Sequence, residues 1–273
     1  MPPAVPPIDD LMDRVADLVR EVSAAVIEPR FRSLADGEVV EKTKGELVTV
    51  ADREAEDLLT AGLAALDPGT PVVGEEAVAA DPRTIDALAA DRVWLVDPLD
   101  GTGNFVWGKP DWATMVALVV GGETAAAWIW QPVTGRLYQA EQGSGATVDG
   151  ERLVAGPRGE TTQALTGAVL TGYLDDATRA QVTPNLDRFG TITTGRHCAG
   201  TEYPALIEGD TDFVLFWRTL PWDHAPGTLL VEEAGGVAAR PDGTPYRPEA
   251  GGKGLLVAAD AATWDLAHAL FDA

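Results

Sequence analysis

The 273-residue sequence has little cysteine and no long hydrophobic run. Its one cysteine, Cys198, excludes an internal disulfide and is typical of a reducing cytoplasm. No apolar run approaches the roughly 20 residues that span a bilayer, and the Pro-rich start lacks the basic and apolar regions of a signal peptide. We therefore expect a cytoplasmic protein that does not bind membranes.

Positive charge is also scarce. The chain has 43 acidic and 20 basic residues, a formal net charge of −23, and its only lysines are Lys42, Lys44, Lys109 and Lys253. The resulting field argues against non-specific binding to nucleic acid or to anionic membranes. It also repels phosphorylated molecules, so a phosphorylated ligand would need cations held locally.

The chain is long enough for one large or two modest domains. Apolar periodicity predicts a long helix over 8–34, which Pro29 kinks or ends early, then a loop or hairpin over 38–47 and a second helix over 52–66. From residue 114 on, β-rich runs separated by turn residues predict helices packed on a mostly antiparallel sheet.

A linker over 156–159 precedes a second half in which strands and helices alternate. The fold class is therefore α/β, with an α+β unit over 1–155 and an α/β unit over 156–273. The tryptophans, Trp107 among them, are expected mainly in the core, although Trp217 could line a pocket.

Two carboxylates follow the apolar run over 93–96. Asp97 and Asp100 are three residues apart, and Pro98 between them predicts a sharp turn. The next residues, 101–103, are Gly-Thr-Gly, which permits close backbone approach and could open a short helix whose N–H groups attract an anion. Acids beside an anion-binding turn are compatible only if a cation lies between them.

Three more carboxylates end apolar segments in the same way, namely Asp52, Glu75 and Asp223. For a single acid of this kind, turn formation or helix capping is the simpler interpretation, and Asp52 could cap the helix that follows it. Together, oxygen donors without a His or Cys companion favour Mg²⁺ over zinc.

Four blocks of the sequence form a recognisable set, and in chain order they are Val48–Asp52, Gly74–Glu76, Asp97–Phe105 and Trp222–Gly227. Together they resemble the inositol monophosphatase family, within the Mg²⁺-dependent, lithium-sensitive phosphatases. The likeness covers nearly the whole chain, and four blocks in order are far more specific than one. It implies an alternating αβαβα layered sugar-phosphatase fold with Mg²⁺ at the interface of the two halves.

The resemblance also implies roles for the acids. Glu75, Asp97 and the carbonyl of Leu99 would hold one ion, and Asp97, Asp100 and Asp223 a second, while a third would share Glu75. Two or three Mg²⁺ ions are therefore expected. Two ions about 4 Å apart can clamp the attacking and leaving oxygens of an in-line displacement.

Further roles follow from the same resemblance. The Thr102 hydroxyl, oriented by Asp52, and Glu75 would activate the attacking water, and the backbone N–H groups of Gly101 and Thr102 would hold the phosphate. No covalent phosphoenzyme is needed. The organic part of the substrate would meet the helix start at Gly200 and Thr201, with Glu202 beside it.

One departure from the family pattern bears on the substrate. Inositol-specific members carry an acid seven residues before the position of Asp223, where this chain has Phe216, followed by Trp217 and Arg218. Inositol phosphate itself is therefore in doubt, and Arg218 could favour a second anionic group. Glu202 could instead supply a compensating carboxylate.

The sequence thus predicts a Mg²⁺-dependent phosphomonoesterase for a small polyol or sugar-like phosphate. Within the family, histidinol phosphate, fructose 1,6-bisphosphate and 3′-phosphoadenosine-type phosphates are alternatives. Outside it stand an aspartyl-phosphate phosphatase, which fits poorly because Asp97 and Asp100 are three residues apart, and a non-enzymatic cation-binding regulator. The expected partner is a small phosphorylated metabolite, and a homodimer is left open.

Overall fold

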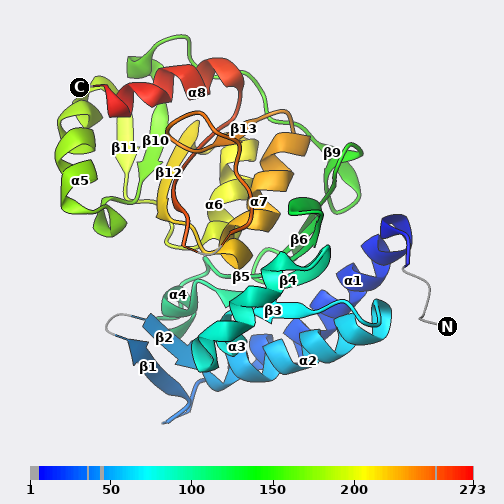
Figure 1. The fold of residues 1–273 in the computed structure, drawn as a ribbon. Helices are drawn as coiled ribbons and strands as arrows, with labels where there is room; N and C mark the ends of the chain where they lie inside the picture. The colour runs from blue at the N-terminus through cyan, green and yellow to red at the C-terminus, as the bar shows by residue number, and fades with distance from the viewer. Residues whose placement is uncertain (1–5, 36, 44–45, 250, 273) are drawn as a thin grey trace.

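The structure, a computed structural model, describes residues 6–35, 37–43, 46–249 and 251–272; Lys44 lies outside these ranges. Helices and sheets alternate in five layers, with two sheets separated by a central pair of helices and each covered by helices on its outer face (Figure 1). The expected αβαβα arrangement is confirmed. Within the described residues, no helix is both long and apolar enough to cross a membrane.

The first sheet has the strand order β3-β4-β5-β6-β7-β8-β9. Its first pair is parallel and every other pair is antiparallel, which confirms the mostly antiparallel prediction. The strands are β3 (Val72–Gly74), β4 (Arg92–Asp100), β5 (Ala113–Val120), β6 (Glu123–Gln131), β7 (Arg136–Glu141), β8 (Gly145–Val148) and β9 (Glu151–Leu153).

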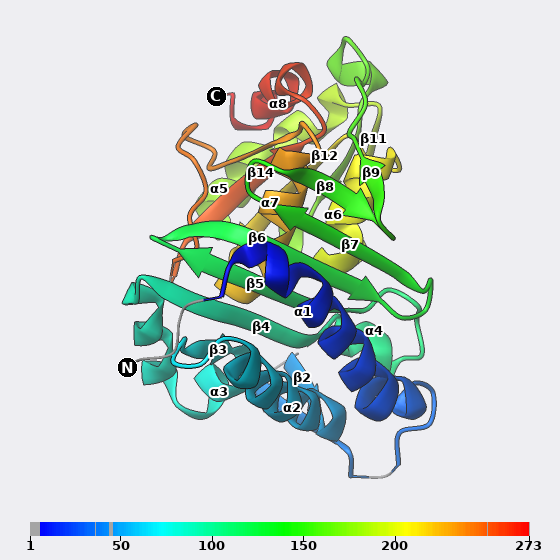
Figure 2. The same ribbon diagram turned by 90° about the vertical axis from the view of Figure 1, so that its right-hand side faces the viewer.

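Helices α1 (Ile8–Val22) and α2 (Val50–Leu66) cover the outer face of this sheet (Figure 2). Residues Leu11, Val15 and Val19 of α1 repeat at a four-residue spacing and are fully buried, as the periodicity predicted. The α-helix is shorter than the expected 8–34. It continues as a π-helical turn over 23–27 and a 3₁₀ turn over 28–30 that contains Pro29, whose missing N–H prevents regular α-helical bonding.

Helix α2 begins two residues earlier than predicted, after the hairpin of β1 (Val39–Thr43) and β2 (Glu46–Thr49). Its cap is Thr49, whose hydroxyl accepts from the Ala51 N–H. Asp52 is therefore not the cap: it is the third helical residue, and its carboxylate accepts from the Thr49 N–H in a capping box. Asp52, held by these reciprocal hydrogen bonds, lies on the buried side of α2.

The second sheet has the order β11-β10-β12-β14-β13. Strands β11, β10 and β12 are parallel, as expected of an α/β half, whereas β14 runs antiparallel to both of its neighbours. The strands are β10 (Thr166–Val169), β11 (Thr191–Thr193), β12 (Phe213–Arg218), β13 (Val237–Ala239) and β14 (Lys253–Ala258); the helices of this half are α5 (Asp176–Val182), α6 (Ala199–Glu208), α7 (Pro221–Glu233) and α8 (Ala261–Ala267).

The two sheets share one apolar layer. Helices α6 and α7 lie between them, so that Tyr203 and Leu230 pack in one buried cluster with Met115 of the first sheet and Val257 of the second. The strands of the first sheet all precede residue 156 and those of the second all follow it. The shared layer nevertheless joins the two halves. Consequently, the residues after β3, the end of β4 and the start of α7 meet on one side of the molecule.

Candidate active site

A cleft of about 600 Å³ opens where the ends of β4 and β12 meet short helices α3 (Glu75–Ala80) and α4 (Thr102–Val106) and the start of α7. The predicted residues that line it are Glu75, Asp97, Leu99, Asp100, Gly101, Thr102, Glu202, Arg218 and Asp223. Asp52 lies behind this surface, in contact with Thr102.

Three carboxylates from separate elements converge in the cleft. Glu75 is the first residue of α3, Asp97 lies in β4, and Asp223 is the third residue of α7. One oxygen atom of each lies within 4.8 Å of the others, and among the described residues this is the one His, Cys, Asp or Glu group with such metal-binding geometry. Residues almost 150 positions apart therefore face a common point.

The expected sharp turn at Pro98 is wrong, because β4 continues to Asp100. Its pairing with β5 instead shifts register: Asp97 lies opposite Met115, whereas Asp100 lies opposite Ala113. Three steps along β4 thus match two along β5, as in a β-bulge. In a regular strand, residues three apart face opposite sides, and this irregularity lets both acids face the cleft.

Gly101 links the strand to α4 in a conformation that other residues rarely adopt. Its φ is 82°, and a Cβ there would lie 2.7 Å from the backbone oxygen of Asp111. The residue is therefore required for the path of the chain, and its backbone lines the cleft.

The electrostatics of the cleft favour a bound cation. Burial, and then the charges of Glu75, Asp100 and Asp223, raise the pKa of Asp97 well above its usual range. Burial and neighbouring acids do the same for Asp223, and burial raises the pKa of Asp100 to about 6 against a backbone hydrogen bond from Gly200. Hard oxygen donors with mutually repelling charges fit a divalent cation such as Mg²⁺.

The Thr102 hydroxyl lies 3.0 Å from Asp52 Oδ1 and 3.0 Å from the Leu99 carbonyl oxygen. It has one proton, so it donates to one of these acceptors at a time. Asp52 is 2% exposed, and its other oxygen accepts from the N–H and hydroxyl of Thr49 at 2.8 and 2.5 Å. Burial raises the pKa of Asp52 to about 7 in spite of these bonds.

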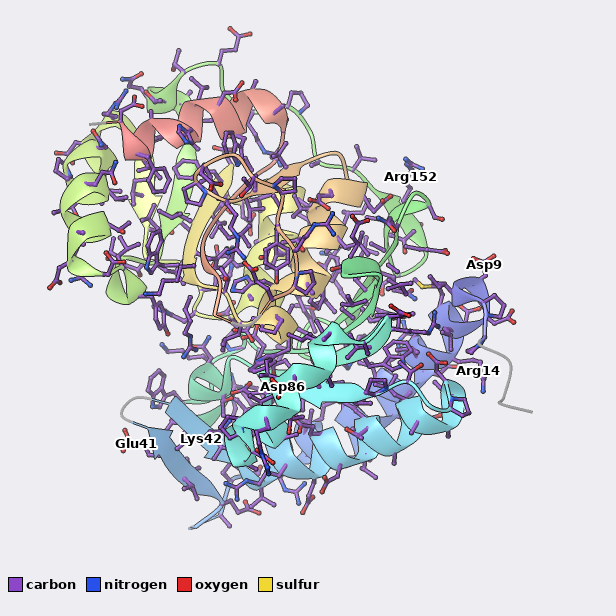
Figure 3. The ribbon with its side chains drawn as sticks, viewed as in Figure 1. Asp9, Arg14, Glu41, Lys42, Asp86 and Arg152 are labelled. Carbon is purple, nitrogen blue, oxygen red and sulfur yellow. The ribbon has the colours of Figure 1, made fainter. Side chains whose placement is uncertain are left out.

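Lys42, on the β1–β2 hairpin (Figure 3), donates hydrogen bonds to Glu75 at 3.0 Å and to Glu76. Burial opposes its charge, but the two carboxylates raise its pKa above the ordinary value. In this structure Lys42 partly neutralises the Glu75 side of the cleft.

The residues expected to contact the organic part of the substrate fall into two groups. Gly200 and Thr201 do not line the cleft: the Gly200 N–H donates to Asp100 Oδ2 at 2.6 Å, and the Thr201 hydroxyl donates to the Cys198 carbonyl. The Cys198 thiol also lies 3.1 Å from Asp100 Oδ2. This helix start therefore holds Asp100 from behind.

Glu202 and Arg218, in contrast, do line the cleft. Glu202 is buried and accepts from the Arg196 N–H at 2.6 Å. The exposed Arg218 guanidinium lies 5.4 Å from the ring centre of Tyr173. Both residues belong to the second half of the chain.

Three features were missed or misjudged from the sequence. Asn104 donates to the carbonyl oxygens of Asp111 and Arg196, both at 2.8 Å, and so ties α4 to the loop before α6. Trp107 is not a core residue, because it is 67% exposed at the edge of the cleft. Glu56 accepts from two N–H groups of α3, and its four-residue spacing from Asp52 on α2 was the available signal.

His224 occupies a core position. Its ring nitrogens lie 2.8 Å from the Tyr203 hydroxyl and 3.0 Å from the Arg218 carbonyl oxygen. Burial lowers its pKa to about 3, so the ring is neutral at physiological pH. Its contacts support the start of α7 next to Asp223.

A family comparison assigns residues 10–272 to the inositol monophosphatase family. The chain therefore belongs to that family, and it is a phosphomonoesterase. This confirms the resemblance that the four sequence blocks indicated.

Individual relatives agree. The chain is 34% identical to a Mycobacterium leprae inositol-1-monophosphatase, over 92% of this chain and 87% of that protein. It is 31% identical to a Thermotoga maritima fructose-1,6-bisphosphatase/inositol-1-monophosphatase (72% and 73%) and 30% identical to the Nus factor SuhB of Escherichia coli K12 (74% of each). A solved Thermotoga maritima IMPase superposes with a TM-score of 0.77 at 25% identity, covering 96% of each chain.

Proposed function

We propose that this protein hydrolyses a small polyol or sugar-like phosphate monoester with Mg²⁺ as cofactor and water as the direct nucleophile. The observation that carries the proposal is the convergence of Glu75, Asp97 and Asp223 to within 4.8 Å. Their mutual repulsion gives a strong reason for a divalent cation to bind. When bound, Mg²⁺ lowers the pKa of the attacking water and neutralises charge on the phosphate and leaving oxygen.

The residues that would hold the cations are those that the family resemblance implies. Glu75, Asp97 and the Leu99 carbonyl form one set, and Asp97, Asp100 and Asp223 form the other, with Glu75 available to a third ion. Asp100 is already oriented by the Gly200 N–H and the Cys198 thiol. A count of two or three ions is a prediction.

Thr102 and Asp52 would orient the attacking water and take its proton. When the Thr102 hydroxyl donates to Asp52, its lone pairs are free to accept from a water in the cleft. Asp52, with a pKa of about 7, suits proton uptake near neutral pH, where a general base works best. Glu75 would help to activate the same water from its other side.

The phosphate would lie against the backbone of Gly101 and Thr102, and the rest of the substrate would extend toward Glu202 and Arg218. Phe216, at the position of the family's substrate-binding acid, is 5% exposed and packs against the Tyr203 ring. It supplies no acceptor for inositol hydroxyls. Arg218, which lines the cleft, would pair with a second anionic group, and the bisphosphatase activity named for the Thermotoga maritima relative is compatible with this.

Phosphate release tests the proposal. We expect Mg²⁺-dependent release from at least one of inositol 1-phosphate, fructose 1,6-bisphosphate, histidinol phosphate and 3′-phosphoadenosine 5′-phosphate, with no turnover in EDTA. Inhibition by Li⁺ at millimolar concentration is also expected. Turnover that persists in EDTA, or none on any of these substrates, would sink the proposal.

A second candidate function is binding without turnover, because SuhB is named as a Nus factor. The net charge of −23 predicts that this chain itself does not bind nucleic acid, so such a role would use a protein partner. An Asp97→Asn variant separates the functions, because it should lose phosphate release and keep any protein complex.

A further inference from the structure

Helix α3 begins without a cap of its own. Its N-cap residue is Gly74, which has no side chain to accept from the first N–H groups of the helix. Those groups matter here because Glu75, the first residue of α3, is the acid that the proposed function places on the cations. The direction of its side chain depends on how the first turn of α3 is held.

Glu56 of α2 supplies the missing cap from another part of the chain. Its two carboxylate oxygens accept from the backbone N–H groups of Glu76 and Ala77, each at 2.7 Å. These are the second and third residues of α3, the positions at which an ordinary N-cap side chain accepts. Glu56 is 6% exposed, so the bonds form away from solvent.

The space around Gly74 is matched to this arrangement. A Cβ at residue 74 would lie within 2.6 Å of the carboxyl carbon and of both oxygens of Glu56. The backbone of Gly74, with φ −107° and ψ 156°, is otherwise open to any residue. Glycine is therefore required at this position by the Glu56 carboxylate and not by the path of the chain.

We propose that Glu56 is a positioning residue for Glu75, acting through the first turn of α3. The same face of α2 then performs two tasks one turn apart, because Asp52 binds Thr102 and Glu56 holds the start of α3. The inference rests on the proposed role of Glu75 as a cation ligand. It adds that cation affinity depends on a carboxylate that does not itself line the cleft.

The test is Mg²⁺ binding to the purified full chain, measured by isothermal titration calorimetry without substrate. Glu56→Ala should weaken binding by about tenfold or more, the usual effect of removing a group that orients a metal ligand. Glu56→Gln should lie between, since its amide oxygen accepts only one of the two N–H groups. Asp175→Ala, which removes the cap of α5, is the matched control and should leave affinity unchanged.

A compensating pair makes the test specific. Gly74→Ser alone should weaken binding, because its side chain collides with Glu56. Glu56→Ala combined with Gly74→Ser should recover most of the affinity, since the serine hydroxyl now caps α3 locally. Glu56→Ala with Gly74→Ala fills the same space without a hydroxyl and should not recover it.

Thermal unfolding in EDTA is recorded for every variant. Wild-type affinity in Glu56→Ala, or a lowered melting temperature with unchanged affinity in Glu56→Gln, would overturn the inference. Failure of every Glu56 variant to fold would also overturn it, since Glu56 would then serve the fold as a whole. If the wild type itself binds no Mg²⁺, or Glu75→Gln binds it normally, the proposed function fails instead.

Discussion

The two walls of the cleft differ in how their functional residues are held. The wall from the first half of the chain carries Glu75, Asp97 and Thr102. Each is held by a hydrogen bond: Lys42 donates to Glu75, the Leu99 N–H donates to Asp97, and the Thr102 hydroxyl lies within hydrogen-bond distance of Asp52 behind the surface. The wall from the second half carries the exposed Arg218 and Tyr173 beside Asp223. We therefore expect the first wall to supply most of the cation ligands and the catalytic groups, with Asp223 joining them from the second wall, whose exposed aromatic and cationic residues we expect to select the substrate.

Asp97→Asn should produce the largest change. Asp97 faces both Glu75 and Asp223, so its loss removes a charge shared by the predicted cation sites. Phosphate release should fall by at least about 10³-fold, since bound metal supplies several kcal/mol of transition-state stabilisation.

In EDTA the variant should melt no lower than the wild type, because a repelling buried charge is gone. A variant that unfolds would make Asp97 a structural residue. Asp86→Asn, an exposed acid that does not line the cleft, is the control.

Thr102→Ala should have the next largest effect, again on the first wall. Losing the hydroxyl between water and Asp52 should lower kcat by about 10²-fold, the range of general acid–base catalysis. The affinity for Mg²⁺ should be unchanged. Thr102→Ser keeps the hydroxyl and should retain most of the activity; equal losses in both variants would refute the proposed proton path.

Arg218→Ala tests the second wall. KM for a substrate with a second anionic group should rise by about tenfold, or about 1.4 kcal/mol, with little change in kcat. A monophosphate of a neutral polyol should be affected less, and steady-state kinetics on both substrates measure the difference. Arg152→Ala, on β9 (Figure 3), is the control. An equal change for both substrates would exclude selection by Arg218.

The smallest effect expected is a pH-dependent stabilisation by Mg²⁺. Without cation, burial raises the pKa of Asp100 to about 6. The cation-free protein is therefore most stable at low pH, where Asp100 is neutral, and it loses this stability as pH rises through that value. Mg²⁺ requires the charged forms of its ligands. The increase in melting temperature that Mg²⁺ causes should therefore grow between pH 5 and pH 8, and scanning calorimetry with and without EDTA measures it. A pH-independent increase would contradict this.

Much of the site could be predicted from the sequence because its parts are local. Asp97, Asp100 and Thr102 lie within six residues, and Asp52 is three residues from its capping partner Thr49. Short-range spacing of this kind determines turns, caps and bulges directly. Even so, the chain does not turn at Pro98: pairing with β5 keeps the strand extended and moves the irregularity into the register.

Contacts between distant segments could not be predicted. Gly200 was expected at the substrate, but its N–H is bonded to Asp100, 100 residues earlier. Glu56 binds α3 across 20 residues, and Asn104 binds the Arg196 carbonyl across 92. Trp107 was assigned to the core by residue type alone, although its position at the cleft edge leaves it exposed.

The sequence by itself determined the class of chemistry, because clustered carboxylates after apolar strands need a cation, and four ordered blocks identify the family. Tertiary structure decided which backbone groups hold Asp100, what caps α3 and which side chains reach the cleft. The physical reason is how far apart in the sequence the bonded groups lie. Hydrogen bonds within a turn follow from neighbouring residues, whereas bonds between segments depend on how the two sheets pack around α6 and α7.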